Sequence, residues 1–402
     1  MRICILTQYY PPEIGAPQTR LSHLANALAS KKHKVYILTA MPNYPTGKYY
    51  NGYSGIINFE KEKHINIIRC CIYSTKSLKI FPRMFSYLSF VVSSLIIGLL
   101  YIPKIDYLMV ESPPLFLGFS AVLLSKSKAS KLIFNVSDLW PDSAVNLDFI
   151  SDGIILKFLY FLEACFYHKA WMITGQSLEI VQNIKKKFPA LHVYHFSNGV
   201  DTMEFSPDKS SPKWRKQFFN NKSIIILYAG LHGLAQGLDQ IIKAALKIPK
   251  TNNISIVFIG DGPEKDHLKL QANQLKLKNV HFFDPLPKKY ISGIVASADI
   301  AIIPLKKHII GAVPSKLYEA MGSGLPVILV AEGEPAHIVK QSKCGVVVEP
   351  GNIKKITDTM VMLSKNLEKR KLMGKRSRTA ALQRFDRNYI AKKFISYLEK
   401  SC

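Results

Sequence analysis

The sequence predicts an α/β protein made of two parallel-sheet domains of similar size that face each other across a cleft. A chain of 402 residues is longer than a single hydrophobic core supports efficiently. Short apolar strands alternate with helical patterns in both halves, which is typical of parallel sheets covered on both faces. Residues 197–207 combine turn formers with proline, as linkers do. We therefore expect an N-terminal domain at 1–197, a C-terminal domain at 198–384, and a helix at 385–402 that packs back on the first domain.

The first residues predict a βαβ unit. Residues 2–7 form an apolar strand, residues 19–30 a helix, and residues 35–39 a second strand. The helix repeats apolar residues with a period of 3.6, at Leu21, Leu24, Ala25 and Leu28. This order indicates a Rossmann-like beginning of the first domain.

The second half predicts a second Rossmann-like domain, because its strands are short, apolar and separated by helical patterns. The expected strands are 224–229, 254–259, 280–283, 300–304, 327–330 and 346–348. The ligand is expected between the two sheets.

Residues 85–102 carry no charge, and this length meets the lower limit for a transmembrane helix. The strands predicted before and after it, at 65–71 and 106–110, should join one sheet, which a membrane span would prevent. Two alternatives stay open: a buried core helix, and a monotopic helix that dips into one leaflet. Residues 149–171 carry aromatic side chains at helical spacing, and for them a core helix and a membrane-facing helix also both stay open.

The formal net charge of +26 predicts attraction to a polyanion. The basic residues are spread along the chain without a basic tail or a nucleic-acid module, which argues against nucleic acid. Together with the two apolar segments, the charge favours an anionic membrane surface. Six cysteines without CxxC pairs and the lack of a secretory h-region fit a reducing compartment. We expect a cytoplasmic protein attached peripherally to the inner face of the plasma membrane.

The strongest chemical signal is the string of residues 313–327, VPSKLYEAMGSGLPV. A helix that begins near Ser315 after a strand opens at the carboxyl edge of the sheet, where α/β folds bind ligands. Its free N–H groups and positive dipole end suit a phosphate, and Lys316 adds a full charge. Glu319, one turn on, could accept hydrogen bonds from ribose hydroxyls. The alternative is a solvated lysine and a helix-end charge.

The chain resembles the retaining family 4 glycosyltransferases with a GT-B fold. Four strings in the expected order carry the resemblance: YYPPEIGAPQTR, DLWPDSAV, SNGVDTMEFSP and PSKLYEAMGSGLPV. Within that family the likeness is greatest to bacterial enzymes for O-antigen, capsule and colanic acid synthesis, including L-fucosamine transferases. It implies transfer of a sugar, such as N-acetyl-L-fucosamine, from a UDP-sugar onto a polyprenyl-diphosphate-linked saccharide.

The resemblance also implies the donor site, with departures from the family pattern. The donor-binding residues would be Gly15, His232, Gln236, Gly311, Ser315, Lys316 and Glu319. Leu231 and Gln236 stand where many members carry Arg and Lys, so the charge on the diphosphate must be met mainly by Lys316. Gly311 replaces a glutamate that contacts the donor sugar, so sugar contacts would use the backbone of residues 311–313.

On the acceptor side, Asp138 stands where the family often has a histidine near the reacting centre. Its carboxylate could orient or deprotonate an acceptor hydroxyl or stabilise positive charge on the sugar. The alternative is a helix cap or a buried acceptor. Ser112 would line the acceptor side. No Asp-x-Asp pair or metal-spaced cluster occurs, so we expect catalysis by Asp138 and Lys316 without metal or cofactor.

Two other functions compete with sugar transfer. A UDP-sugar epimerase of similar fold would not need a lipid acceptor. A basic nucleic-acid-binding protein would not need a nucleotide-sugar.

Overall fold

The computed structural model describes residues 1–77, 79–146, 153–218, 223–249 and 251–401. The chain divides into two compact units, each with its own parallel sheet. Unit 1 comprises Met1–Asn198 and Ile390–Cys402, and unit 2 comprises Gly199–Tyr389. The predicted α/β architecture of two parallel-sheet domains is confirmed.

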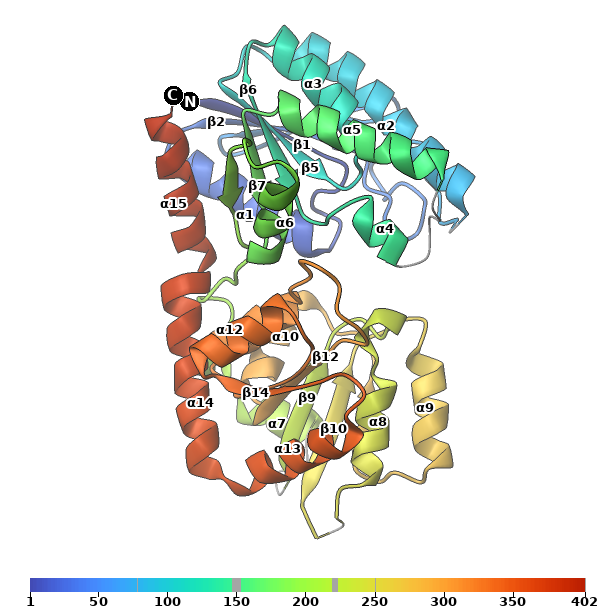
Figure 1. Cartoon of the computed structure of the whole chain (residues 1–402), viewed down its shortest axis with the longest axis vertical. Coiled ribbons are helices and arrows are strands. Elements are labelled where there is room, and N and C mark those ends of the chain that lie inside the picture. The colour runs from blue at the N-terminus through green and yellow to red at the C-terminus, as the bar shows by residue number, and fades with distance from the viewer. Residues whose placement is uncertain (78, 147–152, 219–222, 250, 402) are drawn as a thin grey trace. The chain divides into compact units, whose positions relative to one another are not determined.

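Among the described residues of unit 1, eight strands form one sheet (Figure 1). In spatial order they are β3 (Ile57–Glu62), β4 (Ile65–Cys70), β2 (Lys34–Ala40), β1 (Arg2–Thr7), β5 (Tyr107–Ser112), β6 (Lys131–Val136), β7 (Met172–Gly175) and β8 (Val193–His195). All neighbours pair in parallel except β3, which is antiparallel to β4 at the edge. The predicted strands on either side of residues 85–102, β4 and β5, thus join one sheet.

Helices cover both faces of this sheet. They are α1 (Ala16–Ser30), α2 (Ile80–Tyr101), α3 (Leu117–Ser127), α4 (Asp142–Asn146), α5 (Ile154–Lys169), α6 (Leu178–Lys187) and α15 (Arg387–Lys400). In β1, Cys4 and Leu6 face the core shared with α2, α3 and α5, while Ile3 and Ile5 face α1 and α15. Both faces are therefore buried, as expected for a parallel sheet.

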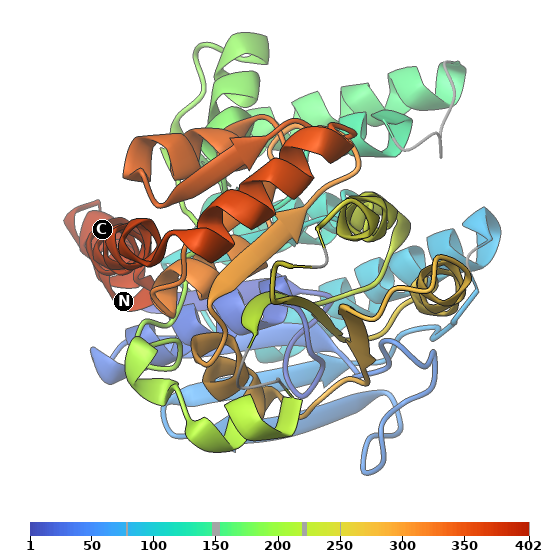
Figure 2. The ribbon, with the colours of Figure 1, turned by 90° about the horizontal axis from the view of Figure 1, so that it is seen from below.

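The C-terminal helix α15 packs within unit 1. Phe394 and Leu398 are buried among residues of β1 and α1, and the Tyr107 hydroxyl donates to the Leu398 carbonyl over 2.9 Å. The two ends of the chain therefore lie close together, as both views show (Figure 1, Figure 2).

Helix α2 buries one side and exposes apolar residues on the other. Phe90 and Ser94 are buried, and the Ser93 hydroxyl donates to the Cys71 carbonyl over 2.6 Å. Val92 and Ile96 stay exposed. Within the described residues, the stretch Phe81–Tyr101 of α2 is the one helix long and apolar enough to cross a membrane. Because β4 and β5 flank α2 in one sheet, a span is excluded by the topology.

In the described part of unit 2, six parallel strands form the second sheet. In spatial order they are β11 (Val280–Phe283), β10 (Ile254–Ile259), β9 (Ile224–Ala229), β12 (Ile300–Pro304), β13 (Val327–Val330) and β14 (Gly345–Val348). Five of the six were predicted with these bounds, and β14 begins one residue before the prediction.

The helices of unit 2 again cover both faces of the sheet. They are α7 (Pro212–Phe218), α8 (Asp239–Leu246), α9 (Lys265–Gln274), α10 (Lys288–Ala296), α11 (Ser315–Gly322), α12 (Glu334–Ser342), α13 (Ile353–Lys365) and α14 (Leu367–Ala380), with short turns at Pro207–Lys209, Leu234–Gln236 and Ala381–Phe385. The core on one face includes α10, α11 and α12, and the core on the other includes α8, α9 and α13. Figure 2 shows α8 and α9 nearly end-on.

Several predicted bounds in unit 1 were wrong by a few residues. Helix α1 begins at Ala16 and not at residue 19, because Pro17 is tolerated in a first helical turn, where no N–H bond is lost. Strand β5 starts one residue later and ends two residues later than predicted. Of the aromatic stripe predicted at 149–171, residues 149–152 lie outside the described residues.

Candidate active site

Helix α11 begins at Ser315, directly after the loop that follows β12. Its N-cap residue is Pro314, and no side chain caps the N–H groups of the first turn. Lys316 lies in this turn, and its Nζ contacts both carboxylate oxygens of Glu319, at 2.9 and 3.2 Å. The predicted neighbours Ser315, Lys316 and Glu319 are thus brought together, and Glu319 supplies an anion for the lysine.

The glycine-rich loop after β9, residues 230–237, lies beside this helix. A Cβ added to Gly230 would lie 3.4 Å from the Lys316 Cε, which is ordinary van der Waals contact. The lysine side chain therefore runs close to the loop backbone. The loop is locked to the turn after β10: a Cβ on Gly260 would fall 1.9 Å from the Gly230 carbonyl oxygen, and the His232 N–H donates to Asp261 over 2.8 Å. Glycine at 260 is therefore required for this close approach.

His232 is fully buried between the aromatic rings of Tyr228, Phe258 and Phe282. Burial, with Lys265 nearby, lowers the pKa of His232 to about 4, so the ring is neutral at pH 7. Within the described part of the chain, neither ring nitrogen has a hydrogen-bond partner. His232 therefore offers no charge to a diphosphate, and only a neutral N–H.

Gln236 ends the short turn Leu234–Gln236 in the same loop. Gly237 follows in the left-handed conformation, and the Lys306 N–H donates to the Ala235 carbonyl over 2.8 Å. This bond ties the glycine-rich loop to the segment after β12. Leu231, which stands where the family often has arginine, is exposed.

Gly311 lies in the loop between β12 and α11 with a φ of 79°. This left-handed backbone is sterically costly for residues with a Cβ. Gly311 is therefore required by the loop conformation, in addition to any contact with a ligand.

In unit 1, the predicted residues Gly15, Ser112 and Asp138 all lie at the carboxyl edge of the sheet. Gly15 is the N-cap of α1 with an extended backbone, so its φ does not explain the glycine. Ser112 ends β5, is buried, and its carbonyl accepts from the Ser137 N–H over 2.8 Å. This bond joins the loop of Ser112 to the loop that carries Asp138.

Asp138 follows β6 in a partly buried loop. Burial raises the pKa of its carboxyl, while hydrogen bonds from Ser143 and the Leu139 N–H pull the pKa down and Asp142 pushes it up. A raised pKa brings a carboxylate closer to the range useful for a general base. The contact with Ser143 of α4 equally fits a helix-capping role.

A buried polar network beneath this edge was not predicted. Arg20 of α1 donates to Glu111 and to the Ser137 hydroxyl, both over 2.6 Å, and to Gln176 over 3.1 Å. Arg20 also donates to Asn198. The signal in the sequence was Glu111, a carboxylate that directly follows the apolar residues of β5. The network thus includes Ser137, the residue before Asp138, and Asn198, where the first segment of unit 1 ends.

Among the described residues, no group of three or more His, Cys, Asp and Glu side chains is arranged to hold a metal ion. The described cysteines are free thiols, and burial raises the pKa of Cys4 to about 12, which leaves that thiol protonated.

The sequence of unit 2 matches a known family. Residues 210–380 match the sequence model of the family described as glycosyl transferases group 1. The chain is 25% identical over 348 residues to the putative colanic acid biosynthesis glycosyl transferase WcaI of Escherichia coli (strain K12), and the matched region covers 83% of this chain and 84% of that protein.

Solved structures share the fold of the whole chain. Sucrose-phosphate synthase from Thermosynechococcus elongatus superposes with a TM-score of 0.78 at 15% identity, over 99% of this chain and 98% of that one. Anabaena HepE in complex with UDP superposes with a TM-score of 0.74 at 16% identity, over the full length of both chains. These likenesses establish the GT-B fold. The chain has a GT-B fold, and its residues 210–380 are similar to glycosyl transferases group 1.

Proposed function

We propose that the chain transfers a sugar from a UDP-sugar onto a polyprenyl-diphosphate-linked saccharide in the synthesis of a surface polysaccharide. The observation that carries the proposal is the uncapped start of α11, where the Lys316–Glu319 pair lies beside the glycine-rich loop. Anabaena HepE, which shares the fold, was solved in complex with UDP, and the name of WcaI places it in colanic acid synthesis. The family model that residues 210–380 match is one of glycosyl transferases, and WcaI is named as a putative glycosyl transferase, which favours transfer over epimerisation.

The donor diphosphate would bind at the start of α11. The free N–H groups of Ser315 and Lys316 and the positive end of the helix suit an anion. When the diphosphate arrives, the Lys316 ammonium can turn from Glu319 to the phosphate oxygens, because the pair is partly exposed. Glu319 is then free to accept from the ribose hydroxyls. Charge on the departing UDP would be stabilised by these groups without a metal ion.

The donor sugar would lie against the backbone around Gly311, since no carboxylate stands there. We propose an N-acetylated hexosamine or deoxyhexosamine, such as N-acetyl-L-fucosamine, transferred with retention of configuration. Gly15, His232 and Gln236 would support the donor through backbone groups and neutral side-chain donors.

Asp138 would act at the reacting centre, by orienting the acceptor hydroxyl or taking its proton, or by stabilising positive charge on the sugar. Its raised pKa supports proton transfer near neutral pH. Ser112, joined to the Asp138 loop through Ser137, would line the acceptor side.

We also propose peripheral attachment to the cytoplasmic face of the plasma membrane through α2, α3 and α5. These helices lie side by side over one face of the unit 1 sheet (Figure 1). Their outer apolar face is formed by Val92, Ile96, Leu100, Phe119, Phe158 and Phe161, all exposed. The one acidic residue in these three helices, Glu163, is buried. Apolar contact combined with positive charge suits an anionic leaflet.

A panel of UDP-sugars, incubated with the purified protein and bacterial membranes, tests the proposal. We expect one UDP-sugar to be consumed with incorporation of its sugar into the lipid fraction, and the Lys316→Ala variant to lose most of this transfer. Conversion of a UDP-sugar into its epimer without lipid incorporation would support the epimerase instead. Tight binding of nucleic acid without consumption of any UDP-sugar would indicate a nucleic-acid-binding protein instead.

A further inference from the structure

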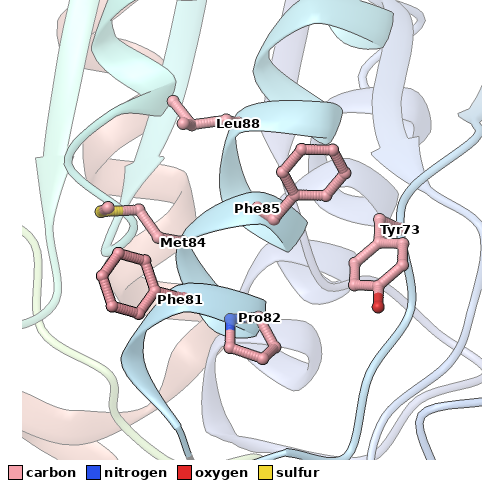
Figure 3. A pocket seen from close by; sticks show the side chains of 6 residues that line it. All are labelled: Tyr73, Phe81, Pro82, Met84, Phe85 and Leu88. Carbon is pink, nitrogen blue, oxygen red and sulfur yellow. The ribbon is translucent and has the colours of Figure 1, made fainter.

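An apolar pocket of about 390 Å³ lies at the start of α2 (Figure 3). Its lining consists of Tyr73, Phe81, Pro82, Met84, Phe85 and Leu88. Tyr73 comes from the segment after β4 and its ring meets Phe85 edge to face at 5.2 Å, while the Tyr73 N–H donates to Ser89 over 2.8 Å. Phe81 and Phe85 are 80% and 62% exposed, so the pocket is open to an apolar ligand.

The pocket lies at the carboxyl edge of the unit 1 sheet, where the candidate acceptor residues also lie. Cys70 at the end of β4 pairs with Ala40 of β2, and β2 pairs in register with β1, so the segment that carries Tyr73 leaves the sheet at the same edge as the β1–α1 loop. Tyr9 of this loop lies within electrostatic reach of Arg83 and Tyr87 on α2. The pocket is therefore next to the loop that ends at Gly15.

Three cations without acidic partners lie close in sequence to the residues that line the pocket. Lys76 and Lys79 precede α2, and Arg83 lies in its first turn, where its guanidinium donates to the Tyr87 hydroxyl over 3.1 Å. None of them takes part in an ion pair found among the described residues. The sequence has no Asp or Glu from Lys63 to Ile105. This end of α2 thus presents positive charge directly beside an apolar surface.

We propose that this pocket binds the lipid end of the acceptor, a diphosphate-linked isoprenoid. Its first isoprene units occupy the apolar pocket, and its diphosphate lies against Lys76, Lys79 and Arg83. The inference rests on the proposed function and extends it by giving the acceptor lipid a site. An isoprenoid diphosphate is chosen over a membrane phospholipid because the pocket adjoins the acceptor edge and pairs an apolar surface with three cations, which match a diphosphate better than one phosphodiester.

The first test compares acceptors that differ only in their lipid. The double variant Phe81→Ser, Phe85→Ser is measured in detergent with the polyprenyl-diphosphate acceptor and with the same saccharide on a short alkyl diphosphate. We expect the KM for the polyprenyl acceptor to rise at least about tenfold, since much of the apolar contact is lost. The KM for the short acceptor and the affinity for UDP should not change. Leu246→Ser with Leu270→Ser, two exposed apolar residues on α8 and α9, is the matched control and should behave as wild type.

A phospholipid in the pocket would give the opposite pattern. The pocket variant would then sediment less with anionic vesicles and keep its KM for the polyprenyl acceptor in detergent, which would overturn the proposal. The diphosphate contact has its own test: Lys79→Gln with Arg83→Gln should raise the KM for both acceptors, because both carry the diphosphate. An unchanged KM for both would overturn that contact.

A binding measurement separates this inference from the proposed function. A polyprenyl diphosphate with a photoreactive isoprene unit should label residues 73–88 in wild type and not in the pocket variant, as located by mass spectrometry. If wild type transfers no sugar but this labelling is found, the proposed function fails and the lipid site stands. If transfer is found and the label maps elsewhere, the lipid site is wrong and the proposed function stands.

Discussion

Removal of the Lys316 charge separates a catalytic role from a structural one. In the free protein the ammonium pairs with Glu319 at 2.9 Å, and the two side chains are 35% and 14% exposed. A helical pair of this kind contributes only about 0.3–0.5 kcal/mol to folding. A charge-assisted contact with a diphosphate is worth about 1.5–3 kcal/mol. Lys316→Ala should therefore lower kcat/KM roughly 10–150-fold and barely change the melting temperature.

The assay measures UDP affinity by isothermal titration calorimetry and sugar transfer on membranes. Lys371→Ala is the matched control, because Lys371 pairs with Glu368 at the same i,i+3 spacing on α14, outside the candidate site. The control should keep wild-type affinity and transfer. Lys316→Arg should restore activity only in part, since a forked guanidinium does not replace a compact ammonium in a tight turn.

Glu319→Gln gives a second, distinct outcome. The amide keeps one acceptor oxygen and loses the charge that strengthens a ribose hydroxyl bond, so UDP affinity should fall. If Lys316→Ala and Glu319→Gln both left UDP affinity and transfer unchanged, the donor site would lie elsewhere, and the pair would be a simple helix contact.

Three further predictions follow from the described residues. Asp138→Asn should lower turnover and leave UDP affinity nearly unchanged, because the proposed role lies at the reacting centre; wild-type turnover would end this assignment, and loss of folding would favour the capping role. Acid should destabilise unit 2 through His232, because burial lowers its pKa to about 4 and the unfolded chain takes up the proton first. The neutral, buried ring of His232 therefore contributes about 3 kcal/mol to the pH-dependent free energy of unfolding. This contribution is fully present above pH 6.5 and is lost as the pH falls to about 4. Urea unfolding followed by Trp214 fluorescence should show a flatter pH dependence for His232→Gln, and parallel curves for the two proteins would refute the role of His232. The protein should sediment with anionic liposomes and be released only in part by high salt. Complete release at moderate salt would exclude insertion of α2, and equal binding to neutral liposomes would exclude the role of charge.

Five of the six strands of unit 2 could be predicted to the residue because their sequence signal is local. The segment of β10, ISIVFI, is almost entirely apolar and buried on both faces, and turn formers bound it. Strand β3 could not be recognised in this way. Its sequence, INFEKE, is mostly polar, because β3 lies at the sheet edge and buries little, and only pairing with β4 defines it as a strand.

The candidate site shows the same division between local and distant signals. Ser315, Lys316 and Glu319 could be grouped from sequence, because residues three or four apart on a helix are neighbours. The burial of His232 depends on rings from three separate strands, and the Arg20–Glu111 contact joins residues 91 positions apart. Such contacts leave no periodic pattern, so the charge state of His232 could not be inferred from its place in a glycine-rich loop.

Gly311 illustrates how a missing side chain can reflect a different backbone. The resemblance to the family suggests a lost glutamate at this position. With a φ of 79°, however, the loop has a conformation that costs a residue with a Cβ about 1–2 kcal/mol. A glutamate would either strain this loop or move it, and in both cases its carboxylate would not simply return to the family position. The selectivity of the proposed donor site would therefore depend on the path of the backbone between β12 and α11, in addition to the side chains that line it.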